Sequence, residues 1–196
     1  MKPILFNTEM VRAILDGRKT QTRRIVKPQP KKMAVPLFSN FLVRAGICYG
    51  CKAKPAYRPG DILYVRETWA KISDWATVDP SVGIPDGFIY RAEWPDGEDG
   101  PKWRPSIHMP KEAARIFLRV TDVRVERLQD ITAKDAQAEG CDGLQHCNPL
   151  LGCAETIYNF KRIWDSTIKP ADRDCYGWAA NPWVWVYTFE RIEEGE

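Results

Sequence analysis

The stretch ARIFLRVTDVRVERL, residues 114–128, alternates apolar and polar residues over more than ten positions. Alternation of this kind is typical of a β-strand with one buried face, because successive side chains of a strand point to opposite sides of the sheet. Ile116, Leu118 and Val120 then share one face. A strand of this length needs partner strands along it, so we expect a β-sheet to organise the fold.

Other segments predict further strands and a few short helices. Residues 181–192, NPWVWVYTFERI, read as a final strand, and residues 58–69, RPGDILYVRETW, read as a turn that leads into another strand. Helices are expected over residues 7–17, 130–140 and 154–166, where apolar side chains recur at helical spacing. Asn7 or Thr8 can cap the first helix and Gly17 ends it, whereas Thr132 with Asp135 resembles a capping box at the start of the second, which Gly140 closes. Strands with few, short helices predict an α+β fold, specifically an antiparallel or mixed β-barrel with helices packed outside it.

The composition is that of a globular protein. The chain has 196 residues, of which 44% are hydrophobic and 28% charged. No run of about 18 apolar residues occurs, so no membrane span is expected. The start, MKPILFNTEM, becomes polar too soon for a secretory signal. These features predict a cytoplasmic protein with no membrane partner.

Positive charge is concentrated near the N-terminus. The formal net charge is +3, but the segment 12–32 holds eight basic residues and a single acid, Asp16. The centre of this segment is GRKTQTRR, residues 17–24, which we expect to form a loop after the first helix. Such a cluster favours an anionic partner such as a nucleotide or RNA, although a solvated basic loop explains the charge equally well.

The six cysteines leave two interpretations open. Cys48 and Cys51 form a C-x-x-C pair, and Cys147 and Cys153 follow far downstream, so the four could bind zinc. The second half lacks the tight spacing of a zinc knuckle, and the chain has no secretory signal. We therefore expect free thiols, no bound metal and no cofactor.

The order of motifs resembles the ASCH domain family. G-x-K-x-x-T-x-R at residues 17–24 is followed by P-G-D at 59–61, by a long strand leading into L-x-x-I-T-x-x-x-A-x-x-E at 128–139, and by a terminal strand at 183–192. The resemblance implies a PUA-like barrel, since ASCH domains are related in fold to the PUA RNA-binding domain. It implies one domain over residues 1–196.

Relative to small ASCH proteins, the chain carries insertions near residues 30–57, 71–108 and 141–178. This long form is similar to the ASCH proteins of bacteriophages and prophages, on the segments LYVRETW, KWRPSIHMP and NPWVWV.

The resemblance also implies an activity. Small bacterial ASCH proteins include amidohydrolases that remove the acetyl group of N4-acetylcytidine, and their catalytic positions fall on Lys19, Thr22 and Glu139. The chemistry is coherent, because a threonine hydroxyl needs a base, which a lysine of lowered pKa supplies, while a carboxylate orients that lysine or protonates the leaving amine. An ordinary Lys19–Glu139 ion pair with Thr22 capping a turn is the alternative. A loop position for Lys19 and Thr22 predicts that truncating either costs little stability.

Five further residues are candidates for substrate binding. Arg18, Arg23 and Arg24 are expected at the mouth of the barrel, where they attract an anion. Arg66 and Glu67 either read a base edge or form an internal pair that braces the barrel. The partner is then RNA or a nucleoside-type ligand. The sequence leaves open an amidohydrolase of N4-acylated cytidine, a non-enzymatic RNA- or nucleoside-binding module, and a ribonuclease.

Overall fold

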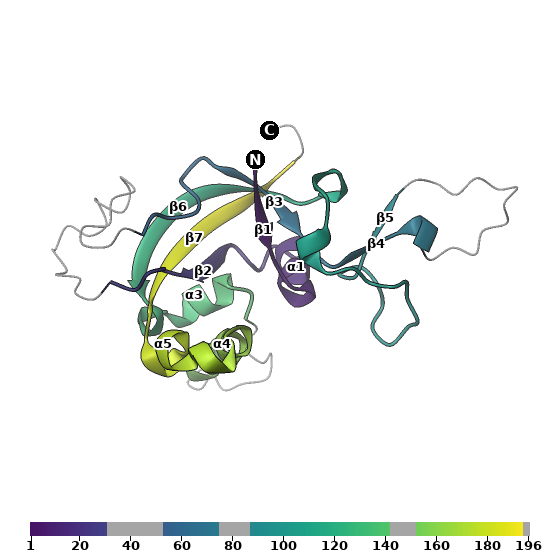
Figure 1. Cartoon of the computed structure of the whole chain (residues 1–196). Coiled ribbons are helices and arrows are strands. Elements are labelled where there is room, and N and C mark those ends of the chain that lie inside the picture. Colours follow the sequence, from purple (N-terminus) through teal and green to yellow (C-terminus); the bar gives the residue numbers. More distant parts are fainter. Residues whose placement is uncertain (31–52, 75–86, 142–151, 194–196) are drawn as a thin grey trace, which may run out of the picture. The chain divides into compact units, whose positions relative to one another are not determined.

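The computed structural model describes residues 1–30, 53–74, 87–141 and 152–193. Its main element is a five-stranded mixed sheet in the order β1-β3-β6-β7-β2, and β4 and β5 form a separate two-stranded sheet (Figure 1). The strands are β1 (Lys2–Leu5), β2 (Gln21–Ile25), β3 (Ile62–Arg66), β4 (Trp69–Lys71), β5 (Phe88–Tyr90), β6 (Phe117–Arg127) and β7 (Trp183–Ile192). The helices are α1 (Thr8–Leu15), α3 (Ala133–Ala138), α4 (Gly152–Thr167) and α5 (Arg173–Tyr176).

The α+β class and the two long strands are confirmed. β6 has 11 residues and β7 has 10, and each lies within the segment that alternation and β-branched residues had indicated. β1 runs parallel to β3, whereas β3 pairs antiparallel with β6, and β2 pairs antiparallel with β7. None of the helices in the described residues is long and apolar enough to cross a membrane.

The predicted closure into a barrel is not observed in the described residues. β1 and β2 are the outer strands of the sheet, so the sheet is open. A closed barrel requires every strand to hydrogen-bond along both edges with a consistent stagger. The outer strands offer only four and five residues for such pairing, far fewer than β6 or β7.

Local signals explain where the helices begin and end. Asn7 caps α1, because its side chain accepts a hydrogen bond from the Met10 N–H at 2.8 Å. Gly17 follows this helix with a φ of 73°, a left-handed conformation that glycine adopts without strain. Thr132 and Asp135 form the predicted capping box at the start of α3. These sequence expectations are confirmed.

The chain forms two compact units by its internal contacts. One comprises residues 1–16, 62–119 and 191–196, and the other comprises residues 17–61 and 120–190. We call them the first and the second unit. Whether the chain is one domain with insertions stays a prediction, and much of the expected insertions lies outside the described residues.

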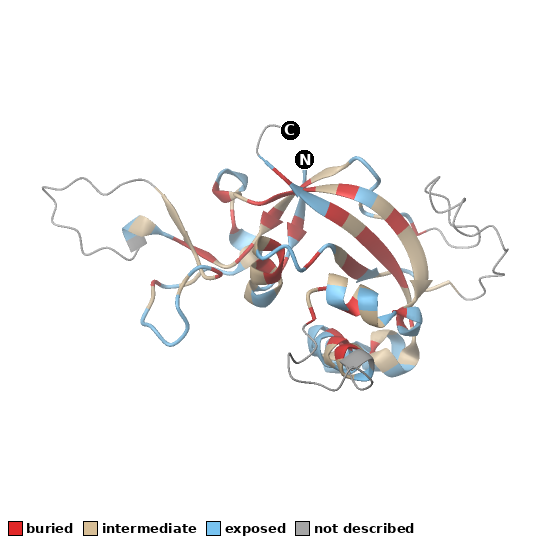
Figure 2. Ribbon diagram, turned by 180° about the vertical axis from the view of Figure 1, so that it is seen from behind, coloured by how far each residue is buried: buried red, intermediate tan, exposed pale blue. Residues whose placement is uncertain are grey.

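The second unit has its core between β7 and the helices. Val184 and Val186 of β7 are fully buried against apolar side chains of α3 and α4, including Ala136, Phe160 and Trp164. Figure 2 shows this buried stretch of β7. β7 is buried on both faces, since Trp185 and Tyr187, which point the opposite way, are also inaccessible to solvent. The face that carries Tyr187 is therefore separate from the helix-covered core.

The charge and the glycine of the segment GRKTQTRR had predicted a loop, but only its first part has no strand structure. Residues 21–25 form β2, which pairs with β7 from Gln21 opposite Thr188 to Ile25 opposite Val184. Pairing with a long, buried neighbour overrides the weak intrinsic preference of a basic segment, because strand formation depends on packing across the sheet. This difference places Thr22, Arg23 and Arg24 on alternating faces of a strand.

Candidate functional site

The predicted catalytic residues lie where the chain enters β2. Lys19 pairs with Glu139 as an isolated β-bridge, Thr20 N–H donates to the Ala138 carbonyl at 2.8 Å, and Phe189 N–H donates to the Thr20 carbonyl at 2.9 Å. The segment before β2 is therefore held between the end of α3 and strand β7. A backbone bridge and a side-chain ion pair both join Lys19 to Glu139, two residues that are 120 positions apart in the chain.

Lys19 and Glu139 form a buried ion pair. The Lys19 ammonium donates to Glu139 Oε2 at 2.8 Å, to the Glu139 carbonyl at 2.9 Å and to the Gln21 carbonyl at 2.8 Å. The Lys19 side chain is completely inaccessible to solvent. Burial lowers the pKa of Lys19, because desolvation disfavours its charged form, and the adjacent Glu139 carboxylate opposes part of this shift.

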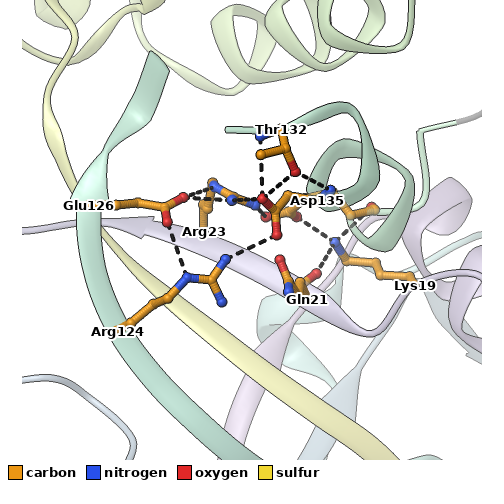
Figure 3. A network of polar contacts seen from close by, with 8 residues as sticks. Lys19, Gln21, Arg23, Arg124, Glu126, Thr132 and Asp135 are labelled. Atoms are coloured by element: carbon orange, nitrogen blue, oxygen red, sulfur yellow. Dashed lines mark hydrogen bonds and ion pairs between the residues drawn. The ribbon is translucent and has the colours of Figure 1, made fainter. Parts of the chain in front are cut away.

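Glu139 also contacts Arg23, which extends the pair into a network (Figure 3). Arg23 donates to Glu139 Oε1 at 3.1 Å and, through two nitrogens, to Glu126 Oε1 at 3.0 and 2.6 Å. Arg124 links the far side, donating to Glu126 at 3.1 Å and to Asp135 at 3.0 Å. Three basic side chains thus face three carboxylates, and their charges balance within the second unit.

Asp135 has two functions in this network. Its carboxylate completes the capping box with Thr132 and also accepts a hydrogen bond from Arg124. Burial raises the pKa of Asp135, but the hydrogen bonds from Thr132 and the charges of Arg23 and Arg124 outweigh it, so the net pKa is lowered. The network therefore remains ionised at neutral pH at this position.

Thr22 lies on the other side of β2 from Arg23, because neighbouring residues of a strand point to opposite faces. Thr22 is buried and lies directly opposite Tyr187 of β7. Its backbone N is bonded to the Gln21 carbonyl carbon, and the Lys19 ammonium donates to that carbonyl. The structure thus joins Lys19 to Glu139 directly and brings the Lys19 ammonium beside the Thr22 backbone.

The three predicted anion-binding arginines have different environments. Arg18 and Arg24 are exposed, and Arg18 reaches the Gly140 carbonyl at 3.5 Å. The Arg23 side chain, in contrast, is completely buried and is paired with Glu126 and Glu139. Its charge is neutralised internally, so its placement does not favour the predicted contact with an anionic ligand.

Arg66 and Glu67 belong to the first unit, and each has a partner there. Glu67 is fully buried and accepts two hydrogen bonds from Arg115, at 2.9 Å to Oε1 and 3.2 Å to Oε2. Burial raises the pKa of Glu67, and Arg115 opposes part of the shift. Arg66 donates to the Ile107 carbonyl. The burial of Glu67 thus fits an internal ion pair better than contact with a nucleobase. The partner in this pair is Arg115, not Arg66 as the sequence had suggested.

Sequence reasoning missed Arg124, Glu126 and Asp135 as members of the network. Arg124 and Glu126 are two positions apart in β6, so the alternation of that strand already placed them on one face. The Asp135 side chain was assigned only to the helix cap. Nothing in the local sequence pairs these residues with Arg23, which comes from a strand about a hundred positions away.

The cysteine hypothesis falls mostly outside the described residues. Cys48, Cys51 and Cys147 are not among them, and the side chain of Cys153 is not described either. Within the described part of the chain, no group of three or more His, Cys, Asp or Glu side chains could hold a metal ion. Zinc binding by the four cysteines and its absence both stay predictions.

Comparison with known proteins adds little. No protein-family model matches the chain, and no curated protein matches it. A solved structure that it resembles is protein EF3133 from Enterococcus faecalis V583, described by the family model DUF984. The likeness covers 98% of this chain and 82% of that one, at 11% sequence identity and a TM-score of 0.44. A likeness at this level carries no argument about function.

Proposed function

We propose that this chain is an ASCH-type amidohydrolase that acts on N4-acylated cytidine or a similar modified nucleoside. The observation that supports the proposal is the contact between the Lys19 ammonium and the Glu139 carboxylate, which are 2.8 Å apart and buried. Two of the three residues that the motif resemblance selects therefore meet. The third, Thr22, follows the carbonyl to which Lys19 donates.

A buried lysine beside a carboxylate can act as a base. Burial lowers the pKa of Lys19, because desolvation disfavours its charged form. A neutral lysine accepts a proton from a hydroxyl and can then donate it to a leaving amine, while the Glu139 carboxylate orients the lysine.

The reaction balances with these groups. The Thr22 hydroxyl oxygen attacks the acyl carbon while its proton passes to Lys19, and the carbonyl oxygen takes the negative charge. The C–N bond then breaks, the amine leaves with the proton that Lys19 accepted, and the acyl group stays on Thr22. Water hydrolyses this ester, which releases the carboxylic acid and restores the threonine hydroxyl.

The test is release of cytidine from N4-acetylcytidine, followed by chromatography. We expect turnover by the wild-type protein and none by Thr22→Val, which removes the hydroxyl but keeps the branched shape of the side chain. The matched control is Thr20→Val, because Thr20 is an exposed threonine two residues earlier in the same segment. Turnover by Thr22→Val at the wild-type rate, with an unchanged melting temperature, would show that Thr22 is not the nucleophile.

A second candidate function is binding of RNA or a nucleoside without catalysis. One observation favours it: the three hydrogens of the Lys19 ammonium each have an acceptor, which stabilises the protonated form and works against its use as a base. Arg18 and Arg24 are both exposed.

This alternative predicts a salt-dependent affinity. The affinity for a single-stranded oligonucleotide should fall as salt rises, and Arg24→Ala should weaken binding and flatten the slope by about one phosphate contact. Arg173→Ala is the control, since Arg173 is also exposed and lies in the same unit. Fluorescence anisotropy at several salt concentrations measures both. An affinity that is indifferent to salt and to Arg24→Ala would exclude an anion-binding role for this arginine.

A further inference from the structure

The face of β2 that carries Thr22 has polar groups that the proposed reaction has not used. Thr22 and Arg24 share this face, and their partners across the strand pair are Tyr187 and Trp185 of β7. Directly opposite residues of an antiparallel pair have their Cβ atoms about 4.5–5.5 Å apart. Tyr187 is therefore the aromatic residue that flanks the proposed nucleophile.

The Tyr187 hydroxyl is buried and accepts a backbone hydrogen bond. Tyr187 is almost completely buried, and its oxygen accepts a hydrogen bond from the Ala56 N–H at 3.0 Å. Burial raises the pKa of Tyr187 to about 12, so the hydroxyl keeps its proton at neutral pH. Across the described part of the chain, the structure assigns no acceptor to that proton. Buried polar hydrogens normally form a hydrogen bond, so a missing acceptor for this hydroxyl hydrogen needs an explanation.

Tyr57 lies against Tyr187. The two rings meet edge to face, with centroids 5.1 Å apart and an interplanar angle of 69°. Tyr57 is half-buried. Burial raises the pKa of Tyr57 and of Tyr187, and the charge of Arg24 opposes part of each rise.

We infer that Tyr187 donates its hydroxyl hydrogen to the acyl carbonyl oxygen of the substrate and that Tyr57 stacks on the nucleobase. The inference rests on the proposed amidohydrolase function and assigns two further residues to its site. A hydroxyl aimed at the oxygen that becomes negative stabilises the tetrahedral intermediate, as an oxyanion hole does. A tyrosine ring offers every base a stacking surface, while Tyr187 and Thr22 select for the acyl group beside it.

The experiment compares single-residue variants on N4-acetylcytidine and measures binding of cytidine, the product, by calorimetry. Tyr187→Phe removes only the hydroxyl, so kcat should fall by about 100- to 1,000-fold with little change in KM. Tyr57→Leu removes the ring, so cytidine should bind about 10- to 100-fold more weakly. Tyr57→Phe keeps the ring and should bind cytidine as the wild type does. Tyr158→Phe, at an exposed tyrosine of α4, is the control for both.

The outcomes separate this inference from the function on which it rests. If the wild-type protein turns over N4-acetylcytidine but Tyr187→Phe keeps its kcat and Tyr57→Leu keeps its affinity for cytidine, the inference is wrong and the function stands. If the wild type neither binds cytidine nor releases it, both fall. Should Tyr187→Phe unfold, the Tyr57→Leu and Tyr57→Phe affinities decide, because equal values in the two would overturn the stacking role and the inference with it.

Discussion

Replacing Arg115 by methionine will destabilise the protein by about 3–5 kcal/mol at neutral pH. Arg115 holds the carboxylate of Glu67 through two hydrogen bonds, and Glu67 is completely buried. Methionine fills much of the same space but leaves that carboxylate without its cationic partner. An unpaired buried charge costs far more than the pair contributes, because desolvation of the ion is no longer compensated. Urea unfolding of the variant and the wild type measures the difference.

The loss should depend on pH with a defined sign. Burial raises the pKa of Glu67 above its ordinary value of 4.5, and loss of Arg115 raises it further. A carboxyl whose folded pKa is raised contributes stability at pH values below its unfolded pKa, and this contribution is lost as the pH rises through the folded pKa. The destabilisation by Arg115→Met should therefore shrink as the pH falls toward 4.5.

The matched variant for this prediction is the double substitution Arg115→Met with Glu67→Gln. It removes both charges, so it should recover much of the stability that the single substitution loses. A double variant as unstable as Arg115→Met alone would mean that the arginine acts through its other contacts, which are the ion pair with Glu93 and the Tyr90 ring 3.9 Å from the guanidinium carbon, rather than through Glu67.

Replacing Lys19 by methionine will destabilise the second unit by about 3 kcal/mol, at the lower end of the range for a broken buried pair. Glu139 then keeps Arg23 as its partner, but the Glu139 and Gln21 carbonyls each lose the Lys19 donor. The sequence expectation that truncation at Lys19 costs little stability assumed a loop position, whereas the Lys19 side chain lies in a buried network, so we expect a large loss instead. Chemical unfolding measures the loss.

A double-mutant cycle tests the origin of this loss. Glu139→Gln alone, Lys19→Met alone and the two together give the coupling energy between these side chains. We expect a coupling of about 1–3 kcal/mol, since the two groups are in direct contact and buried. Additive effects would contradict the pairing. The cycle also identifies the temperatures at which each variant is folded. Turnover by Lys19 variants has to be measured at those temperatures, so that a loss of activity is not caused by unfolding.

Much of the fold was predictable from local patterns. Side chains of a strand alternate between its two faces, so the alternating residues 114–128 indicated the position of β6. The capping box at Thr132 and Asp135 located the start of α3, because its two hydrogen bonds join residues three positions apart. Signals of this kind need no tertiary contact, which is why they can be read from the sequence.

β2 shows where such reading fails. Its residues, QTRRI, carry two arginines and no apolar alternation, so charge alone predicted a loop. The strand exists because β7 supplies a buried partner along its whole length. Arg23 is buried in it because Glu126 and Glu139, from β6 and the end of α3, neutralise its charge. Those partners are distant in sequence, so only the folded chain could identify them.

The candidate site divides in the same way. The sequence by itself determined the residue types, a lysine, a threonine and a glutamate in a motif order that resembles the ASCH family, together with the strands and caps around them. Only the tertiary structure decided that Lys19 and Glu139 touch, that Arg23 is internal, and that Thr22 faces Tyr187. The physical reason is that residue type and local period depend on neighbours in the chain, whereas burial, ion pairing and the facing of two strands depend on segments brought together by folding.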